Sequence, residues 1–184
     1  MDGVALGIFV GGRSRRMGRP KGLLPAPSGD ETLLARLVRL GRAAGLEVVL
    51  VGDAEPYAGL LPRVPRIADD PPGVGPIGGL RGLLRARPVA VVVACDMPAV
   101  DGRLLERLRD VAGVVVPRDE RWEPLCARYE AELALPAIEE ALLAKDHSLQ
   151  GLLRRIGPTV LSVPRDKLVD WDEPGDVTGV LPEG

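Results

Sequence analysis

The segment Val4-Ala5-Leu6-Gly7-Ile8-Phe9-Val10-Gly11-Gly12 has the composition of a buried β-strand that runs into a glycine loop. Continuous runs of apolar and β-branched residues are typical of strands that are covered on both faces of a parallel sheet. Similar runs return at 47–51 and at 89–94. Amphipathic helical periodicity separates these runs, at about 31–44 and at 77–85. The alternation predicts an α/β fold with a mainly parallel sheet.

The rest of the chain continues this pattern with shorter elements. Further strands are predicted at 66–68, 114–116, 160–163 and 168–171. Further helices are predicted at 57–61, 103–108, 136–143 and 149–155. Pro136 then falls in the first turn of its helix, where a missing N–H costs nothing. Because no linker, repeat or low-complexity tract interrupts the order, we expect a single domain over residues 1–184.

Composition excludes several classes of protein. With 46% apolar and 27% charged residues, the sequence is neither disordered, collagen-like nor a disulfide scaffold. The longest apolar run, 89–95, has seven residues, far below the length of a membrane span. A net charge of −2 and 3% aromatic residues argue against nucleic-acid binding. Cys95 and Cys126 match no metal or redox spacing, which favours reduced, buried thiols in a cytoplasmic protein. The short apolar runs predict no contact with a membrane.

Glycines and carboxylates follow the predicted strands. Gly11-Gly12 follows the first strand, Gly52-Asp53 the second, Asp69-Asp70 the third and Asp96 the strand at 89–94. Ligands of open α/β sheets bind beyond the carboxyl ends of the strands. These residue types predict phosphate and metal handling at that edge, and Asp96, directly after an all-apolar strand, is the strongest candidate for a Mg²⁺ ligand.

The loop at 11–21 carries the positive charge that such a site needs. Its glycines allow the backbone to approach an anion closely, and successive N–H groups can form a nest around phosphate. Arg16 and Lys21 can stabilise the negative charge that a phosphoryl group gains in its transition state. No window supplies the P-loop pattern Gly-x-x-x-x-Gly-Lys-Ser/Thr. A solvated basic loop is the alternative interpretation.

The segment 73–78 fits the dinucleotide-binding pattern Gly-x-Gly-x-x-Gly, but its context does not fit. That fingerprint requires a strand that leads directly into the first glycine, whereas Asp70-Pro71-Pro72 precedes it here. Pro76 also lacks the N–H that a phosphate would need. A dehydrogenase is therefore disfavoured.

The motifs together identify a family resemblance that extends over nearly the whole chain. Gly-Gly-x-Ser-x-Arg-Met-Gly at 11–18, followed by Lys21, resembles the signature loop of the nucleotidyltransferases that include molybdenum cofactor guanylyltransferase. Four further segments resemble motifs of that family in the same order: Asp69 with Gly75-Pro76-Ile77-Gly78-Gly79, Cys95-Asp96-Met97-Pro98, Glu123-Pro124-Leu125-Cys126-Ala127-Arg128-Tyr129, and Asp170-Trp171-Asp172-Glu173-Pro174-Gly175-Asp176.

The resemblance implies a fold, a reaction and partners. The fold would be a Rossmann-like three-layer sandwich of the nucleotide-diphospho-sugar transferase type. The reaction would move GMP from GTP to the terminal phosphate of molybdopterin or the molybdenum cofactor and release pyrophosphate, with Mg²⁺ as cofactor. Transient contacts with other cofactor-biosynthesis or acceptor proteins would fit such an enzyme.

The resemblance also implies roles for individual residues. The catalytic residues would be Arg16, Lys21 and Asp96, with Asp96 holding the metal. The nucleotide would contact Phe9, Val10, Gly11, Gly12, Lys21, Val51, Asp69, Gly75, Gly79 and Asp96. The acceptor would lie near His147, Asp170 and Asp172.

Departures from the family pattern leave alternatives open. Val51 replaces an asparagine, and Asp170 and Asp172 stand where guanylyltransferases usually carry asparagines. The aspartates resemble those of cytidylyltransferase relatives, so transfer of CMP to molybdopterin or another phosphorylated acceptor is one alternative. A regulatory nucleotide-binding module without catalysis is another. Asp172 could hold a second metal or sit in a solvated turn.

Three of these residues could instead have a purely structural role as caps of helices or turns. Asp96 could cap the helix at 103–108, Asp69 could cap a turn, and His147 could cap the helix that follows it.

Overall fold

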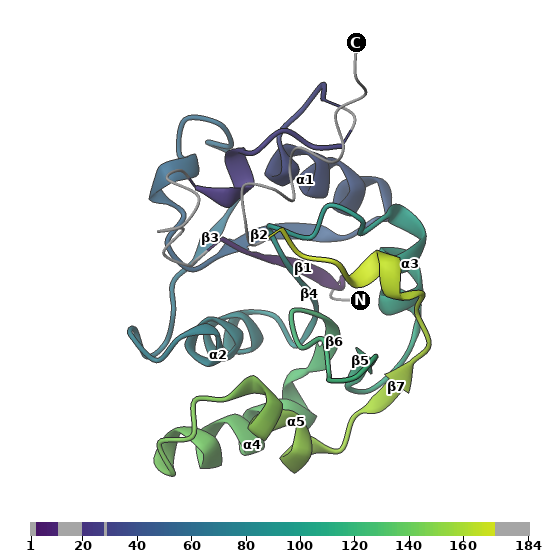
Figure 1. Ribbon diagram of the computed structural model, residues 1–184. Coiled ribbons are helices and arrows are strands. Elements are labelled where there is room, and N and C mark those ends of the chain that lie inside the picture. Colours follow the sequence, from purple (N-terminus) through teal and green to yellow (C-terminus); the bar gives the residue numbers. More distant parts are fainter. Residues whose placement is uncertain (1–2, 11–19, 28, 172–184) are drawn as a thin grey trace.

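Strand order explains how this protein builds its binding edge. The structure, a computed structural model, describes residues 3–10, 20–27 and 29–171. Their strands form one sheet in the order β3-β2-β1-β4-β6-β5-β7 (Figure 1). The bounds are β1 Ala5–Phe9, β2 Glu47–Val51, β3 Arg66–Ile67, β4 Val89–Ala94, β5 Val115–Pro117, β6 Cys126–Glu130 and β7 Thr159–Leu161. Among these strands β6 alone runs antiparallel to its neighbours, β4 and β5.

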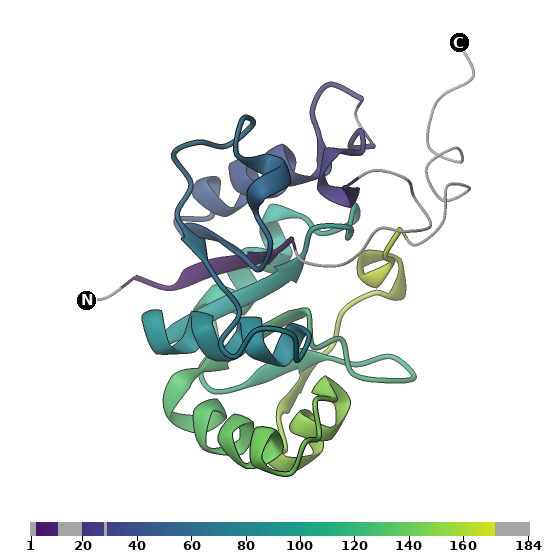
Figure 2. The ribbon, with the colours of Figure 1, turned by 90° about the vertical axis from the view of Figure 1, so that its left-hand side faces the viewer.

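Helices cover both faces of the sheet. The bounds are α1 Leu33–Ala43, α2 Pro76–Ala86, α3 Gly102–Asp110, α4 Ala131–Leu143 and α5 Leu149–Ile156. Helices α1 and α3 pack on one face, and α2, α4 and α5 pack on the other (Figures 1 and 2). Short 3₁₀ turns lie at η1 Lys21–Leu23, η2 Glu55–Tyr57 and η3 Arg165–Leu168. The expected three-layer α/β sandwich with a mainly parallel sheet is confirmed. None of the described helices is long and apolar enough to cross a membrane.

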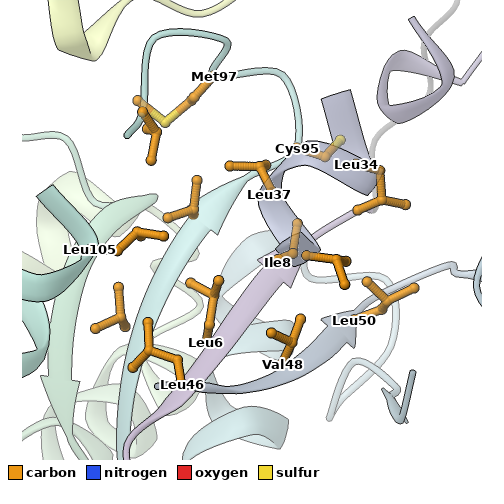
Figure 3. Packing of buried hydrophobic residues seen from close by; sticks show 14 of the residues in the cluster. Leu6, Ile8, Leu34, Leu37, Leu46, Val48, Leu50, Cys95, Met97 and Leu105 are labelled. Carbon is orange, nitrogen blue, oxygen red and sulfur yellow. The ribbon is translucent and has the colours of Figure 1, made fainter. Parts of the chain in front are cut away.

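The first strand, β1, contributes side chains to both halves of the core, because successive side chains alternate between the faces of the sheet. Leu6 and Ile8 point toward α1 and pack near Leu34 and Leu37 (Figure 3). Phe9 lies in the cluster on the opposite face. Continuous apolar sequence in β1 is therefore required by its central position between two helical layers.

Four elements differ from the sequence predictions. The helix predicted at 57–61 is the 3₁₀ turn η2, which ends at Tyr57, and β6 was not predicted as a strand. The segment 168–171 is not a strand: η3 ends at Leu168, and Trp171 donates its backbone N–H to the carbonyl of Asp96 at 2.9 Å. Helix α4 begins at Ala131, so Pro136 lies inside the helix and not in its first turn. Burial of Ala134 and a hydrogen bond from Ala131 N–H to the Pro88 carbonyl (2.8 Å) anchor the turn before the proline.

The antiparallel strand β6 brings a further segment to the binding edge. The parallel strands β1, β2, β3 and β4 all end at this edge. Because β6 runs the other way, its first residue, Cys126, pairs with Val93 near the end of β4. The backbone N–H of Ala94 donates to the Leu125 carbonyl at 2.8 Å. The residues that precede β6 thus lie beside the residues that follow β4.

Candidate active site

Lys21 and Asp96 meet at the centre of this edge. Asp96 follows β4, where the N–H of Cys95 donates to the Phe9 carbonyl at 3.1 Å and fixes the strand end against β1. Lys21 begins η1, and its Nζ donates to Asp96 Oδ2 at 2.7 Å. Their side chains are only 18% and 16% exposed. Two of the predicted catalytic residues, 75 positions apart in sequence, therefore form one partly buried ion pair.

Four predicted nucleotide-binding residues converge around α2. Gly79 lies in the first turns of α2, and a Cβ added there would lie 2.9 Å from Phe9 Cε1, 2.9 Å from Val51 Cγ1 and 3.0 Å from Asp69 Oδ1. Real Cβ atoms do not tolerate such distances, so glycine is required by the close approach of three segments. The sequence prediction that these residues share one site is consistent with this geometry.

Gly75 lies directly before α2, and Asp69 lies beside Gly79. Gly75 precedes α2 with φ of 77°, a left-handed backbone conformation that favours glycine. Asp69 is half-buried, and burial together with the nearby Asp53 carboxylate raises its pKa. No side-chain hydrogen bond of Asp69 to another described residue gives it a turn-capping role. Its neighbour Asp70 instead forms ion pairs with Arg81 (2.6 Å) and Arg85 (3.1 Å).

A cleft of about 370 Å³ extends from the ion pair along the edge toward β6. Val10, Lys21 and Asp96 line one part of it. Residues before β6 and in the first turn of α5 line the other part, among them Arg121, Trp122, Glu123 and Gln150. The cleft thus extends from the predicted phosphate site at Lys21 and Asp96 to a second region beside the start of β6. Gly79 does not line this cleft.

Buried Tyr57 and Cys95 form part of the wall of the cleft. The hydroxyl of Tyr57 accepts the N–H of Gly22 at 3.4 Å. Burial, and then the neighbouring Cys95, holds the pKa of Tyr57 well above its usual range. Burial, and then the Asp96 carboxylate, raises the pKa of Cys95 to about 12. Neither group ionises near neutral pH, so Cys95 is no thiolate nucleophile.

The residues expected near the acceptor do not all reach the cleft. Asp170 lines it and is held there because Trp171 hydrogen-bonds to the Asp96 backbone. His147 is exposed and is not among the residues that line the cleft. It does not cap α5 either, because Ser148 Oγ accepts the N–H of Gly151 at 3.1 Å. Gly11, Gly12, Arg16 and Asp172 lie outside the described residues.

Sequence reasoning missed several cleft residues. Tyr57, Trp122 and Gln150 received no functional role, and Glu123 was noted only as part of a motif. The available signal was that Trp122 and Glu123 stand together in a chain with 3% aromatic residues. No local pattern marks Gln150, whose Nε2 donates to the Trp122 carbonyl at 2.7 Å across 28 residues.

The chemistry of the donors suits a hard divalent cation that arrives with a substrate. Asp96 offers a carboxylate at the cleft, and Mg²⁺ commonly combines one or two carboxylates with phosphate oxygens and water. Within the described part of the chain, no group of three or more His, Cys, Asp or Glu residues could hold a metal by itself. Asp96 is not the cap of α3, because Asp101 Oδ1 accepts the N–H of Leu104 at 2.9 Å. Asp96 therefore remains available for a ligand role.

Comparison with known proteins identifies the family. The family model described as "MobA-like NTP transferase domain" matches residues 7–160. The chain belongs to this family. A MobA-like relative from Opitutus terrae, named a probable molybdenum cofactor guanylyltransferase, is 34% identical over 92% of this chain and 90% of its own length.

Solved structures agree with the MobA-like assignment. Molybdopterin-guanine dinucleotide biosynthesis protein A from Archaeoglobus fulgidus superimposes with a TM-score of 0.75 and 26% identity over 96% of both chains. The 2-C-methyl-D-erythritol 4-phosphate cytidylyltransferase from Thermus thermophilus superimposes with a TM-score of 0.69 at 20% identity over 97% of both chains. The second likeness concerns the fold alone, so the fold is shared by proteins that are named for different bases.

Proposed function

We propose that this protein transfers GMP from GTP to the terminal phosphate of molybdopterin, with Mg²⁺, and releases pyrophosphate. Membership of the MobA-like family and the names of its relatives support the reaction class. The observation that carries the proposal is the contact of Lys21 Nζ with Asp96 Oδ2 at 2.7 Å. A cation and a carboxylate thus lie side by side in the cleft, at the ends of segments that follow β1 and β4.

The reaction needs no nucleophile from the protein. An oxygen of the acceptor phosphate attacks the α-phosphorus of GTP, and the bond from that phosphorus to the bridging oxygen of the β-phosphate breaks. Pyrophosphate leaves with the electron pair. Because the attacking oxygen is already anionic, catalysis consists of positioning the two substrates and stabilising charge. The high pKa of Cys95 is consistent with a reaction in which the protein supplies no nucleophile.

Lys21 and Asp96 have complementary roles in this proposal. The Lys21 ammonium can exchange its carboxylate partner for a phosphate oxygen and stabilise the departing pyrophosphate. Asp96 would hold Mg²⁺, which when bound supplies positive charge to the phosphates. Arg16 is proposed to assist Lys21, and Gly11-Gly12 to bind the nucleotide.

The base is proposed to lie beside Phe9 and Gly79, and the acceptor in the cleft. Asp69 supplies a half-buried carboxylate at the first region. Asp170 lines the second. We also propose that the protein works in the cytoplasm, where reduced thiols such as its two buried cysteines persist. Transient contact with proteins that deliver molybdopterin or receive the product belongs to the same proposal.

The decisive experiment measures pyrophosphate release with GTP or CTP, each with and without molybdopterin. Release that requires both GTP and molybdopterin supports the proposal. Release with CTP in preference to GTP would replace it with a cytidylyltransferase. Nucleotide binding without any release would favour a regulatory module. A Mg²⁺ titration in the same assay tests the metal requirement.

A further inference from the structure

Three residues fix the shape of the cleft at the end that lies toward β6. The chain turns back between β5 and β6, where Arg118 and Trp122 form an isolated antiparallel bridge. This connection projects from the layers in Figure 2. The Arg118 guanidinium lies over the Trp122 ring, 4.7 Å from its centroid. Gln150 from α5 donates to the Trp122 carbonyl at 2.7 Å. This end of the cleft is therefore built from two elements that hold each other in place.

Glu123 is positioned rigidly at this end through its backbone. Its N–H donates to the Pro117 carbonyl at 3.0 Å, and its carbonyl accepts the N–H of Cys126 at 3.0 Å. Both bonds tie it to the ends of β5 and β6. The side chain is half-buried and lines the cleft. Among the described residues, no side-chain donor forms a hydrogen bond with its carboxylate, so its acceptor atoms are not used by the fold.

The local charge determines which chemical group suits Glu123. Burial raises the pKa of the Glu123 carboxyl, Arg121 lowers it, and Asp170 and Asp119 raise it further. Two carboxylates, those of Glu123 and Asp170, line the same cleft. N–H groups of a ligand would gain charge-assisted hydrogen bonds from the Glu123 carboxylate. The phosphate of an acceptor would lie instead at the other part of the cleft, the part that Lys21 and Asp96 line.

A pterin presents the complementary edge. Its pyrimidinone ring carries a ring N–H beside an exocyclic amino group, so two parallel N–H donors can meet the two oxygens of one carboxylate. An acceptor that has a phosphate at one end and a pterin at the other would place the phosphate near Lys21 and the donor edge near Glu123. The cleft joins these two regions.

Building on the proposed function, we propose that Glu123 is a specificity-determining residue that accepts two N–H hydrogen bonds from the pterin ring of the acceptor. Trp122 and Gln150 position it by fixing the wall of the cleft. The inference concerns the acceptor ring and not the nucleotide, and it can be tested without turnover.

The test compares two fluorescent probes, 6-hydroxymethylpterin and 6-hydroxymethyllumazine. The lumazine has a carbonyl oxygen in place of the amino group, which would face the carboxylate unfavourably. Binding is measured by fluorescence anisotropy for the wild-type protein, for Glu123→Gln, and for Glu120→Gln. Glu120 is an exposed glutamate in the same connection and serves as the matched control. Glu123→Gln keeps the side-chain size and removes no hydrogen bond of the described fold.

The wild-type protein and Glu120→Gln should prefer the pterin by about 10- to 100-fold, as expected for a bidentate charged contact. Glu123→Gln should reduce this preference to within about threefold, because its amide offers only one acceptor atom. In the transfer assay it should raise KM for molybdopterin and leave KM for GTP unchanged. An unchanged pterin preference in Glu123→Gln would overturn the inference. So would a loss of Mn²⁺ affinity with intact pterin preference, since Glu123 would then be a metal ligand.

The two proposals fail in different ways. Transfer of GMP to molybdopterin by a wild-type protein that binds both probes equally would overturn the role of Glu123 and leave the proposed function intact. Pterin preference that depends on Glu123, in a protein that releases no pyrophosphate from GTP, would support this inference and overturn the proposed function.

Discussion

Replacing Asp96 by asparagine separates the contribution of this residue to the fold from its contribution to catalysis. The substitution keeps the side-chain volume and an oxygen that can accept from Lys21, but it removes the negative charge. The two side chains are 18% and 16% exposed and 2.7 Å apart, so the pair is neither a solvated surface pair nor a fully buried one. A hydrogen bond between charged groups of this kind contributes about 1–2 kcal/mol more than a neutral one.

The fold should therefore survive. A loss of about 1–2 kcal/mol is small beside the roughly 5–15 kcal/mol of a typical domain. For a chain of this size it corresponds to a fall in Tm of about 2–8 °C. The variant should remain folded at 25 °C, with an unchanged circular dichroism spectrum.

Turnover should fall far more than stability. Loss of the carboxylate that holds the metal and its phosphates should remove about 4 kcal/mol of transition-state stabilisation, which is about 1,000-fold in kcat. The assay is pyrophosphate release with GTP, Mg²⁺ and molybdopterin at 25 °C. Asp110→Asn is the matched control, because Asp110, whose side chain is 62% exposed, pairs with Arg109 at the surface. The control should leave kcat and Tm unchanged. If Asp96→Asn kept half of the wild-type kcat, Asp96 would not be a catalytic residue.

Three further predictions concern the nucleotide. Lys21→Arg should lose about 100-fold in kcat/KM although the charge is kept, because a planar guanidinium cannot place its charge where the compact ammonium lies; steady-state kinetics that show a loss below about threefold would contradict this. Gly79→Ala should raise KM for GTP and lower the free energy of unfolding by about 1–3 kcal/mol, since its Cβ would displace Phe9 and Val51, 2.9 Å away. Gly102→Ala, at the open start of α3 and 3.9 Å from the nearest side chain, should be neutral in the same denaturant titration. GTP with Mg²⁺ should raise Tm, and CTP or ATP should do so much less, because a pocket matched to guanine leaves groups unpaired against other bases at about 1–3 kcal/mol each; an equal shift with CTP in differential scanning fluorimetry would refute the guanine preference.

The central strands could be predicted from sequence because burial on both faces requires continuous apolar residues. The runs at 47–51 and 89–94 coincide with β2 and β4. Asp96 could be singled out for the same reason, since a carboxylate directly after such a run lies at the carboxyl edge of the sheet. These features depend on neighbours in sequence and need no knowledge of distant contacts.

Strand β6 could not be found in this way, because its sequence Cys-Ala-Arg-Tyr-Glu carries two charged residues. Its pairing with β4 and β5 buries Arg128, whose guanidinium is held by one tertiary contact and one contact within the strand. Its Nη1 donates to the Arg109 carbonyl at 2.9 Å, and its Nη2 donates to Glu130 Oε1 at 2.9 Å. The strand state of this segment is thus a property of its surroundings.

The sequence by itself determined the α/β class, the strands that are buried on both faces, and the chemical character of the residues that follow them. Only the tertiary structure decided which of these residues meet. Lys21 contacts Asp96 because β1 and β4 are adjacent in the sheet, although 75 positions separate the two residues. Glu123 shares their cleft because β6 is antiparallel and returns the chain to the same edge. Local sequence sets the conformation of each element, whereas contacts between distant residues depend on the order and direction of the strands, which no local pattern encodes.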